Sequence, residues 1–299
     1  MNEKHNTLVI DCFPYNGELV ALFRVQYLYK HVDRFVVIEA RQTYSGKQKE
    51  ALEFHKNRIM FEPYMDKITY VVIDEFPEPD PAWLQAIPSR FPWMAESSYD
   101  SWWREMYQRE YGERYIREHY LHTRALVICS DADEIPREDA IVVARNMYDE
   151  FSNAPVFLEM KFFYYNFRWC KNQDWYYAFI INTTYLANHP LFQTDGETLL
   201  SSFSEIRVAA PRTRVMPMAG WHCSYFASKE DLKRKLESFS HREFDREEFK
   251  TSEYLEKCIN NGKDIANRGP SEDCRRFDDP SSLPRNWQTL QQMLVLVQS

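Results

Sequence analysis

LVICSDADEIP, at residues 126–136, is the stretch from which the fold of this chain is inferred. Its four leading apolar residues predict a short strand that is buried on both faces, as in the centre of a parallel sheet. Three acidic residues follow almost at once, at Asp131, Asp133 and Glu134. In open α/β sheets the ligand binds outside the carboxyl ends of the strands, and these acids would lie there.

Asp131 and Asp133 project to the same side if the chain stays extended beyond the strand. Carboxylates held this close repel each other unless a cation lies between them. Oxygen ligands of this kind suit Mg²⁺ or Mn²⁺, and a phosphate oxygen commonly completes the shell. The motif therefore predicts a site for a metal and a diphosphate. A solvated acidic turn that caps the next helix is the alternative, since acid-x-acid triplets arise by chance among 45 Asp and Glu residues.

The composition limits the possible size of the domain, the compartment and the classes of partner. With 299 residues, 44% of them hydrophobic, and only 7 glycines, the chain can form one large α/β domain or two small ones. No apolar run is long enough to span a membrane and the N-terminus lacks the apolar segment of a signal peptide, so we expect a cytoplasmic protein. The net charge of −8 disfavours a nucleic-acid partner. The 6 cysteines show no CxxC pair and are expected to be reduced.

The first 75 residues alternate between strand and helix patterns. Strands are predicted at residues 8–10, 34–39 and 68–74, with amphipathic helices at 18–32 and 50–64 between them. This order is typical of right-handed βαβ units and a parallel sheet. The three strands run into acids, and no GxGxxG or GxxxxGK[ST] motif occurs, so dinucleotide-binding and P-loop sites are not expected.

The rest of the chain predicts additions to this core. Residues 75–99 contain five prolines and are expected to form a lid or substrate wall, followed by a helix at 101–120. Another helix is expected from Pro136 to about residue 149. Aromatic-rich segments at 156–167 and 175–185 predict antiparallel strands. A compact stretch at 219–226 surrounds His222, and helices are expected at 229–240 and 290–297.

Four stretches of the chain resemble glycosyltransferase family 17. They are Asp11-Cys12-Phe13 with Glu18, Arg24 and residues 32–39; Trp103-Arg104-Glu105 with Gln108-Arg109; DADEIP at 131–136; and AGWHCS at 219–224. Together they span residues 8 to about 265 in order. The resemblance implies a GT-A-like α/β fold, with a mostly parallel central sheet and antiparallel additions in the second half. It also implies an inverting transferase that uses a UDP-sugar donor, with UDP-GlcNAc favoured, and a glycan acceptor.

The resemblance places Asp131 and Asp133 in a DxD motif that binds Mn²⁺ or Mg²⁺, with His222 in the same site. It implies one domain over residues 1–299, in which 1–150 bind the nucleotide-sugar and metal, 151–265 form the acceptor side and 266–299 wrap the surface. Residues 168–215 match poorly, so the donor class carries over better than the acceptor.

An inverting transferase needs a metal at the leaving diphosphate and a general base for the acceptor hydroxyl. Glu205 is the expected base, because such bases tend to lie several tens of residues beyond the DxD motif; Asp174, Asp195 and Glu197 remain alternatives. Asp11 and Glu39 are expected to bind the ribose or nucleoside, and Arg41, Lys47 and Arg109 to reach the diphosphate. For the first four of these residues, a solvated loop charge is the alternative, and for Arg109 it is an exposed ion pair with Glu105.

Two other functions use similar residues. A metal-dependent phosphohydrolase or nucleotidyltransferase would also place acids at strand ends, but would show no donor-sugar preference. A non-catalytic glycan-binding module would use an aromatic groove without any dependence on metal.

Overall fold

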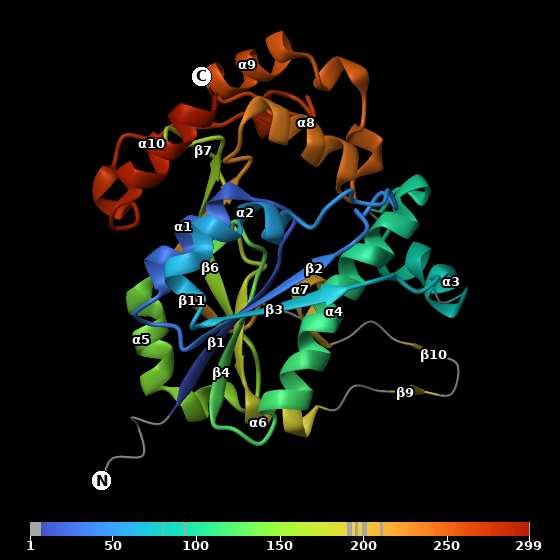
Figure 1. Ribbon diagram of the computed structural model, residues 1–299, viewed down its shortest axis with the longest axis vertical. Helices are drawn as coiled ribbons and strands as arrows, with labels where there is room; N and C mark the ends of the chain where they lie inside the picture. The colour runs from blue at the N-terminus through green and yellow to red at the C-terminus, as the bar shows by residue number, and fades with distance from the viewer. Residues whose placement is uncertain are drawn as a thin grey trace.

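The computed structural model describes residues 7–79, 81–92, 94–189, 193–194, 197–198, 202–209 and 212–298. Its centre is a parallel sheet of β3 (Ile68–Ile73), β2 (Arg34–Ala40), β1 (Leu8–Pro14) and β4 (Ala125–Cys129), in that spatial order. The predicted strands are therefore confirmed, and Cys12 of β1 lies in register with Cys129 of β4. Figure 1 shows β1 rising from the N-terminal end of the molecule, with the orange α8 and α9 above the sheet.

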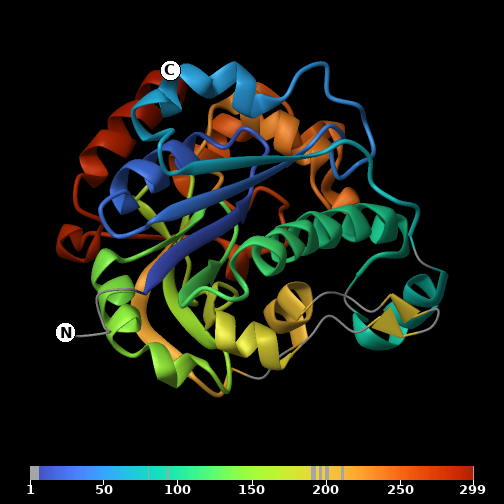
Figure 2. The same cartoon turned by 60° about the horizontal axis from the view of Figure 1, so that its bottom comes forward.

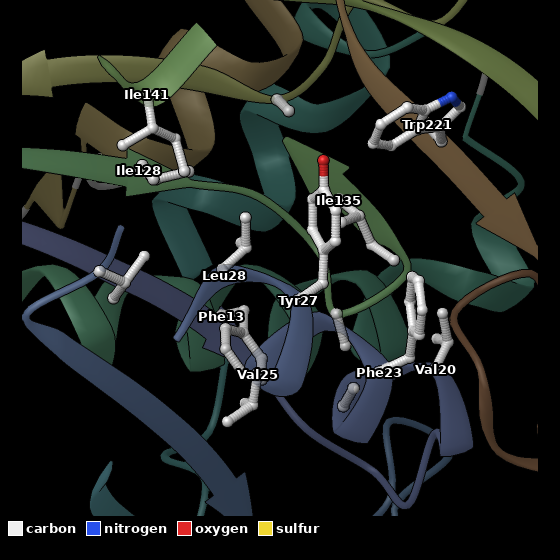
Figure 3. Packing of buried hydrophobic residues seen from close by; sticks show 14 of the residues in the cluster. Phe13, Val20, Phe23, Val25, Tyr27, Leu28, Ile128, Ile135, Ile141 and Trp221 are labelled. Carbon is white, nitrogen blue, oxygen red and sulfur yellow. The ribbon is translucent and has the colours of Figure 1, made fainter. Parts of the chain in front are cut away.

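Helices cover both faces of this sheet (Figures 1 and 2). On one face, α1 (Leu19–Leu28), α5 (Glu138–Asn146) and α10 (Trp287–Gln298) pack in one hydrophobic cluster with the strands. Figure 3 shows part of this cluster, where Ile141 of α5 lies beside Ile128 of β4 and Phe13 of β1 lies beside Val25 of α1. On the other face, α4 (Tyr99–Tyr120) and α6 (Thr183–Asn188) pack in a second cluster.

The second half of the chain extends the sheet, as predicted, but in a mixed manner. β8 (Phe179–Asn182) pairs antiparallel with β4, and β6 (Val156–Tyr164) pairs antiparallel with β8. The AGWHCS stretch ends β11 (Val215–Ser224), which runs parallel to β6 and antiparallel to the short β5 (Glu134–Pro136). The mixed α/β architecture with a large, mostly parallel sheet and antiparallel additions is thus observed.

Other elements complete the chain. The proline-rich segment, expected to form a lid or substrate wall, contains a helix, α3 (Pro81–Arg90). In the described part of the chain, the remaining helices and strands are α2 (Glu53–Phe61), β7 (Trp169–Cys170), β9 (Gln193–Thr194), β10 (Glu197–Thr198), α7 (Ser202–Ala209), α8 (Lys229–Ser238), α9 (Ser252–Asn261) and β12 (Arg275–Arg276). Short 3₁₀ turns lie at residues 62–64, 96–98, 148–151, 242–244, 247–249, 270–272 and 280–282. Within the described ranges, no helix has both the length and the apolar character that crossing a membrane requires.

Candidate active site

The acidic motif forms a tight loop between the end of β4 and β5. The backbone N–H of Asp131 donates to Oε2 of Glu134 at 2.8 Å, and the N–H of Glu134 donates to the carbonyl of Asp131 at 3.0 Å. The Glu134 side chain is fully buried and accepts further bonds from Arg207 and the indole of Trp175. Glu134 therefore shapes the loop from inside, while Asp131 and Asp133 face the cavities described below.

A buried arginine on α1 holds this loop from below. Nη1 of Arg24 donates to the carbonyls of Asp131 and Glu134 at 2.6 and 2.7 Å, and its Nη2 donates to the hydroxyl of Ser130. Asp11 neutralises Arg24 through an ion pair of 2.5 Å, and neither side chain is exposed. The carboxylate of Asp11 is therefore occupied by a buried ion pair and does not make the nucleoside contact that was expected from the sequence.

Two arginines surround Asp131. Nη2 of Arg109 on α4 lies 3.0 Å from Oδ1, and Nη2 of Arg207 on α7 lies 2.6 Å from Oδ2. Burial acts to raise the pKa of Asp131, but the two guanidinium groups outweigh it and hold the pKa below its usual value. Asp131 is thus ionised and places two cationic side chains at the cavity wall. Arg109 also pairs with Glu105, one helical turn away, at 2.5 Å.

Asp133 lies between a lysine and a histidine. Nζ of Lys235 on α8 is 3.2 Å from Oδ2, and Nε2 of His222 is 3.5 Å from Oδ1. Although burial opposes ionisation, these two neighbours hold the pKa of Asp133 well below its usual value. The same carboxylate raises the pKa of Lys235, against the effect of burial. At neutral pH, Asp133 and Lys235 are therefore an ion pair.

His222 is fixed by the sheet and by two aromatic rings. It lies opposite Glu134 in the β5–β11 register, and the N–H of Cys223 donates to the carbonyl of Asp133 at 2.7 Å. Its ring stacks on Phe162 at 4.5 Å and contacts Trp175 at 4.3 Å between centroids. Its Nδ1 is buried without a hydrogen-bond partner among the described residues. An unsatisfied buried polar atom is uncommon and favours a functional role for this side chain.

Two cavities meet at this acidic loop. The α8 cavity, of about 510 Å³, lies between the β1–α1 turn, residues 43–56 and α8. The α4–α7 cavity, of about 430 Å³, lies between α4, α7 and the acidic loop, and aromatic side chains such as Trp102 and Tyr177 line it. Six residues line both cavities: Asn16, Glu18, Tyr44, Asp133, Lys235 and Phe239. Asp133 is therefore at the boundary between two spaces, each large enough for part of a substrate.

The other residues expected at the diphosphate and nucleoside are distributed differently. Glu39 is fully buried, where it accepts bonds from the N–H groups of Glu53 and Phe54 at the start of α2 and from Lys49. Arg41 pairs with Asp74 on the surface and lines neither cavity. Lys47 lines the α8 cavity and Arg109 the α4–α7 cavity.

The expected general base does not face the acidic loop. On α7, the cavity wall is formed by Ser204, Arg207 and Val208, and Glu205 is not among the lining residues. Because successive helical residues are about 100° apart, Glu205 points away from that face. Of the alternatives, Asp174 pairs with Lys161 at 3.7 Å outside both cavities. Asp195 lies outside the described residues, as does the side chain of Glu197.

Asp133 and His222 are the protein groups that fit a divalent metal best. In the described part of the chain, no three His, Cys, Asp or Glu side chains converge on one point. Such a cluster is not required, since Mg²⁺-type ions commonly keep one or two protein ligands and take the rest from phosphates and water. The 3.5 Å between Oδ1 of Asp133 and Nε2 of His222 is close to the separation of about 3 Å expected for adjacent ligands of an octahedral ion. Asp133 and His222 are therefore suitable ligands for a divalent metal.

The family model for glycosyltransferase family 17 matches residues 2–274, which include all four resembling stretches. The chain belongs to glycosyltransferase family 17. As a member of this family it is a glycosyltransferase. No curated protein sequence matches the transferase. A crystal structure of S. aureus TarS 1-349 is similar at 12% identity, covering 85% of this chain and 72% of that chain, with a TM-score of 0.33. That score is too low to support an argument.

Two cationic residues of the site, Arg207 and Lys235, were not predicted from the sequence. Arg207 follows Asp131 by 76 residues, and Lys235 follows Asp133 by 102. Lys235 adjoins Leu236, which with Leu232 forms the buried face of a mostly polar helix, and this is a weak signal for a charge directed inward. Arg207 carries no comparable local signal.

Proposed function

We propose that this glycosyltransferase moves a sugar, preferably GlcNAc, from a UDP-sugar to a hydroxyl of a glycan acceptor, with inversion at the anomeric carbon and with Mn²⁺ or Mg²⁺ as cofactor. The observation that carries the proposal is the position of Asp133. Its carboxylate lies at the boundary of two cavities, with His222 and Lys235 on its two oxygens. A reaction between two substrates needs such a meeting point.

The cations of the site support a diphosphate leaving group. Arg109, Arg207 and Lys235 all line the α4–α7 cavity within reach of the acidic loop. In the structure their charges are satisfied by Asp131, Glu134 and Asp133. Phosphate oxygens are suitable partners for guanidinium and ammonium groups. We infer that Lys235, which lines both cavities, binds the diphosphate when the donor substrate occupies the site beside Asp133.

In this mechanism, Asp133 and His222 would hold the metal, and a bound divalent cation would neutralise the developing charge of the diphosphate. Coordination by Asp131 as well would require Arg109 or Arg207 to move, so we assign Asp131 the role of positioning these two arginines. Arg24 and Glu134 keep the loop in one conformation. The aromatic walls of the α4–α7 cavity orient sugar rings and exclude water from the reacting carbon.

The decisive experiment measures binding and turnover together. Thermal shift with UDP-GlcNAc, UDP-Gal, UDP-Glc and GDP-Man, each with Mn²⁺ and with EDTA, should show stabilisation by a UDP-sugar only when the metal is present. Release of UDP in the presence of glycan acceptors then tests transfer. Release of inorganic phosphate or pyrophosphate without sugar preference would instead support a phosphohydrolase or nucleotidyltransferase. Glycan binding that is insensitive to EDTA, with no turnover, would support a binding module.

A further inference from the structure

The boundary between the two cavities contains a carboxylate with an unusual environment. Glu18 occupies the N-cap position of α1, yet its side chain makes no capping hydrogen bond to the helix. Instead, Oε2 accepts the backbone N–H of Asn16 at 2.7 Å. The preceding Gly17 has φ of +96°, a conformation that favours glycine, and this turn places Glu18 at the wall of both cavities.

Glu18 differs from its neighbours because it lacks an ion pair. Of the seven other carboxylates that line the cavities, six are paired with a cation and the seventh, Glu50, is exposed; the six are Glu53, Glu105, Asp131, Asp133, Asp231 and Glu237. No Lys, Arg or His of the described ranges pairs with Glu18 in this way. Burial, which dominates, raises its pKa, and the N–H of Asn16 and the charge of Lys235 only partly oppose this. The protein therefore keeps a half-buried carboxylate, without a cation partner in the described chain, at the wall of both cavities.

The chemistry of the group restricts what it can bind. An ionised carboxylate only accepts hydrogen bonds, so its partner must carry a donor. A phosphate would be repelled. The metal position beside Asp133 and His222 does not include Glu18, because no three such ligands converge in the described residues. Sugar hydroxyls are donors of this kind, and both substrates of the proposed reaction carry them.

We propose that Glu18 binds a sugar hydroxyl of the substrate at the boundary between the α8 and α4–α7 cavities. This inference rests on the proposed function. The hydroxyl belongs either to the ribose of the donor or to the acceptor sugar. In the first case Glu18 contributes to nucleotide affinity, and in the second it receives the hydrogen bond of the attacking hydroxyl. In both cases the carboxylate gains a hydrogen-bond donor when substrate binds.

The test compares wild type with E18Q, and with E253Q as a matched control on the exposed surface of α9. The first arm measures the affinity of UDP, 2′-deoxy-UDP and 3′-deoxy-UDP by calorimetry with Mn²⁺. If the ribose is the partner, E18Q binds UDP about 10-fold more weakly, and one deoxy analogue loses a similar factor in wild type but not in E18Q. The control binds UDP as wild type does.

The second arm measures transfer from saturating UDP-GlcNAc to p-nitrophenyl glycosides. If the acceptor is the partner, E18Q keeps its UDP affinity but loses about 10-fold or more in kcat or in acceptor kcat/KM. E18Q values within twofold of wild type in both arms would overturn the inference. Should E18Q fold poorly, E18D replaces it, since the shortened carboxylate loses the same contact. Failure of wild type to bind any nucleotide-sugar would instead refute the proposed function itself.

Discussion

Arg24 and Asp11 form an ion pair of 2.5 Å in which neither side chain is exposed to solvent, directly beneath the acidic loop. The same guanidinium donates to the carbonyls of Asp131 and Glu134, so one buried charge connects α1, β1 and the loop. Asp11 thus serves the site without facing the cavities, because it keeps Arg24 charged and correctly oriented. This relationship makes a direct prediction about stability.

Asp11→Asn should lower the free energy of unfolding by about 3–5 kcal/mol, because it leaves the buried guanidinium of Arg24 without its counter-ion. Urea denaturation followed by tryptophan fluorescence measures the change. Asp74→Asn is the matched control. Asp74 pairs with Arg41 on the surface, where the two side chains are 80% and 53% exposed, and this pair should contribute at most about 1 kcal/mol. Unchanged stability together with weaker nucleotide binding in Asp11→Asn would restore the nucleoside role expected from the sequence.

The parallel strands and the place of the acidic motif were predictable because their signals are local. Apolar runs at residues 8–10, 34–39, 68–74 and 126–129 correspond to β1, β2, β3 and β4, and the acids after β4 lie where such sheets bind ligands. Glu39, in contrast, was expected to face a ligand and instead accepts the N–H groups at the start of α2. An acidic residue at a strand end can bind a ligand or can satisfy groups of the protein itself, and the sequence does not show which of these it does.

The partners of the acidic motif could not be predicted, because they come from distant segments. Arg207 and Lys235 reach Asp131 and Asp133 from α7 and α8, and no sequence periodicity connects these helices to the loop. The expected base, Glu205, shows the same difficulty: its helix reaches the cavity, but Ser204, Arg207 and Val208 occupy the facing side. Moving one position along a helix turns the side chain by about 100°, so the distance in sequence from a motif cannot predict which residue of α7 faces the cavity.

Asp133→Asn should reduce transfer by about 100-fold or more while the fold survives, because the variant loses the anionic metal ligand but keeps the shape of the side chain. UDP release from UDP-GlcNAc with Mn²⁺ measures the activity, and circular dichroism verifies the fold. Asp149→Asn is the control, since that side chain is 88% exposed. Activity of wild type that persists after EDTA treatment would argue against metal dependence altogether.

His222→Ala separates a metal ligand from a packing residue. If His222 binds metal, the Mn²⁺ concentration needed for half-maximal activity should rise by about 10–100-fold, with little change in melting temperature. If the ring only packs between Phe162 and Trp175, the variant should instead lose about 1–3 kcal/mol of stability and keep its metal dependence per folded molecule. Both quantities are measured on the same preparation, and we expect the first result.

The cysteines should all be free thiols that react slowly in the native protein. All six are unpaired, five of them are buried, and burial raises the pKa of the half-buried Cys274 to about 12. At pH 8 only about one Cys274 side chain in 10⁴ is then a thiolate. Mass spectrometry after iodoacetamide treatment without reductant should show little native labelling and six adducts in urea. A Cys12–Cys223 disulfide in fresh protein would contradict this expectation.

Glu18→Gln should raise the melting temperature at pH 7, and the gain should vanish towards pH 4. The folded protein raises the pKa of Glu18 through burial, so ionising this carboxyl opposes folding. The carboxyl is largely neutral in both states below its unfolded pKa of about 4.3, and it imposes no penalty there. As the pH rises through the elevated folded pKa, the wild type loses stability and the neutral variant does not. Thermal melts of both proteins between pH 4 and 8 measure the difference, with Glu253→Gln expected to show none. A difference that is independent of pH would mean that the carboxylate is better solvated, or better paired, than its position at the cavity wall implies, and would weaken the case that it is held ready for a substrate hydroxyl.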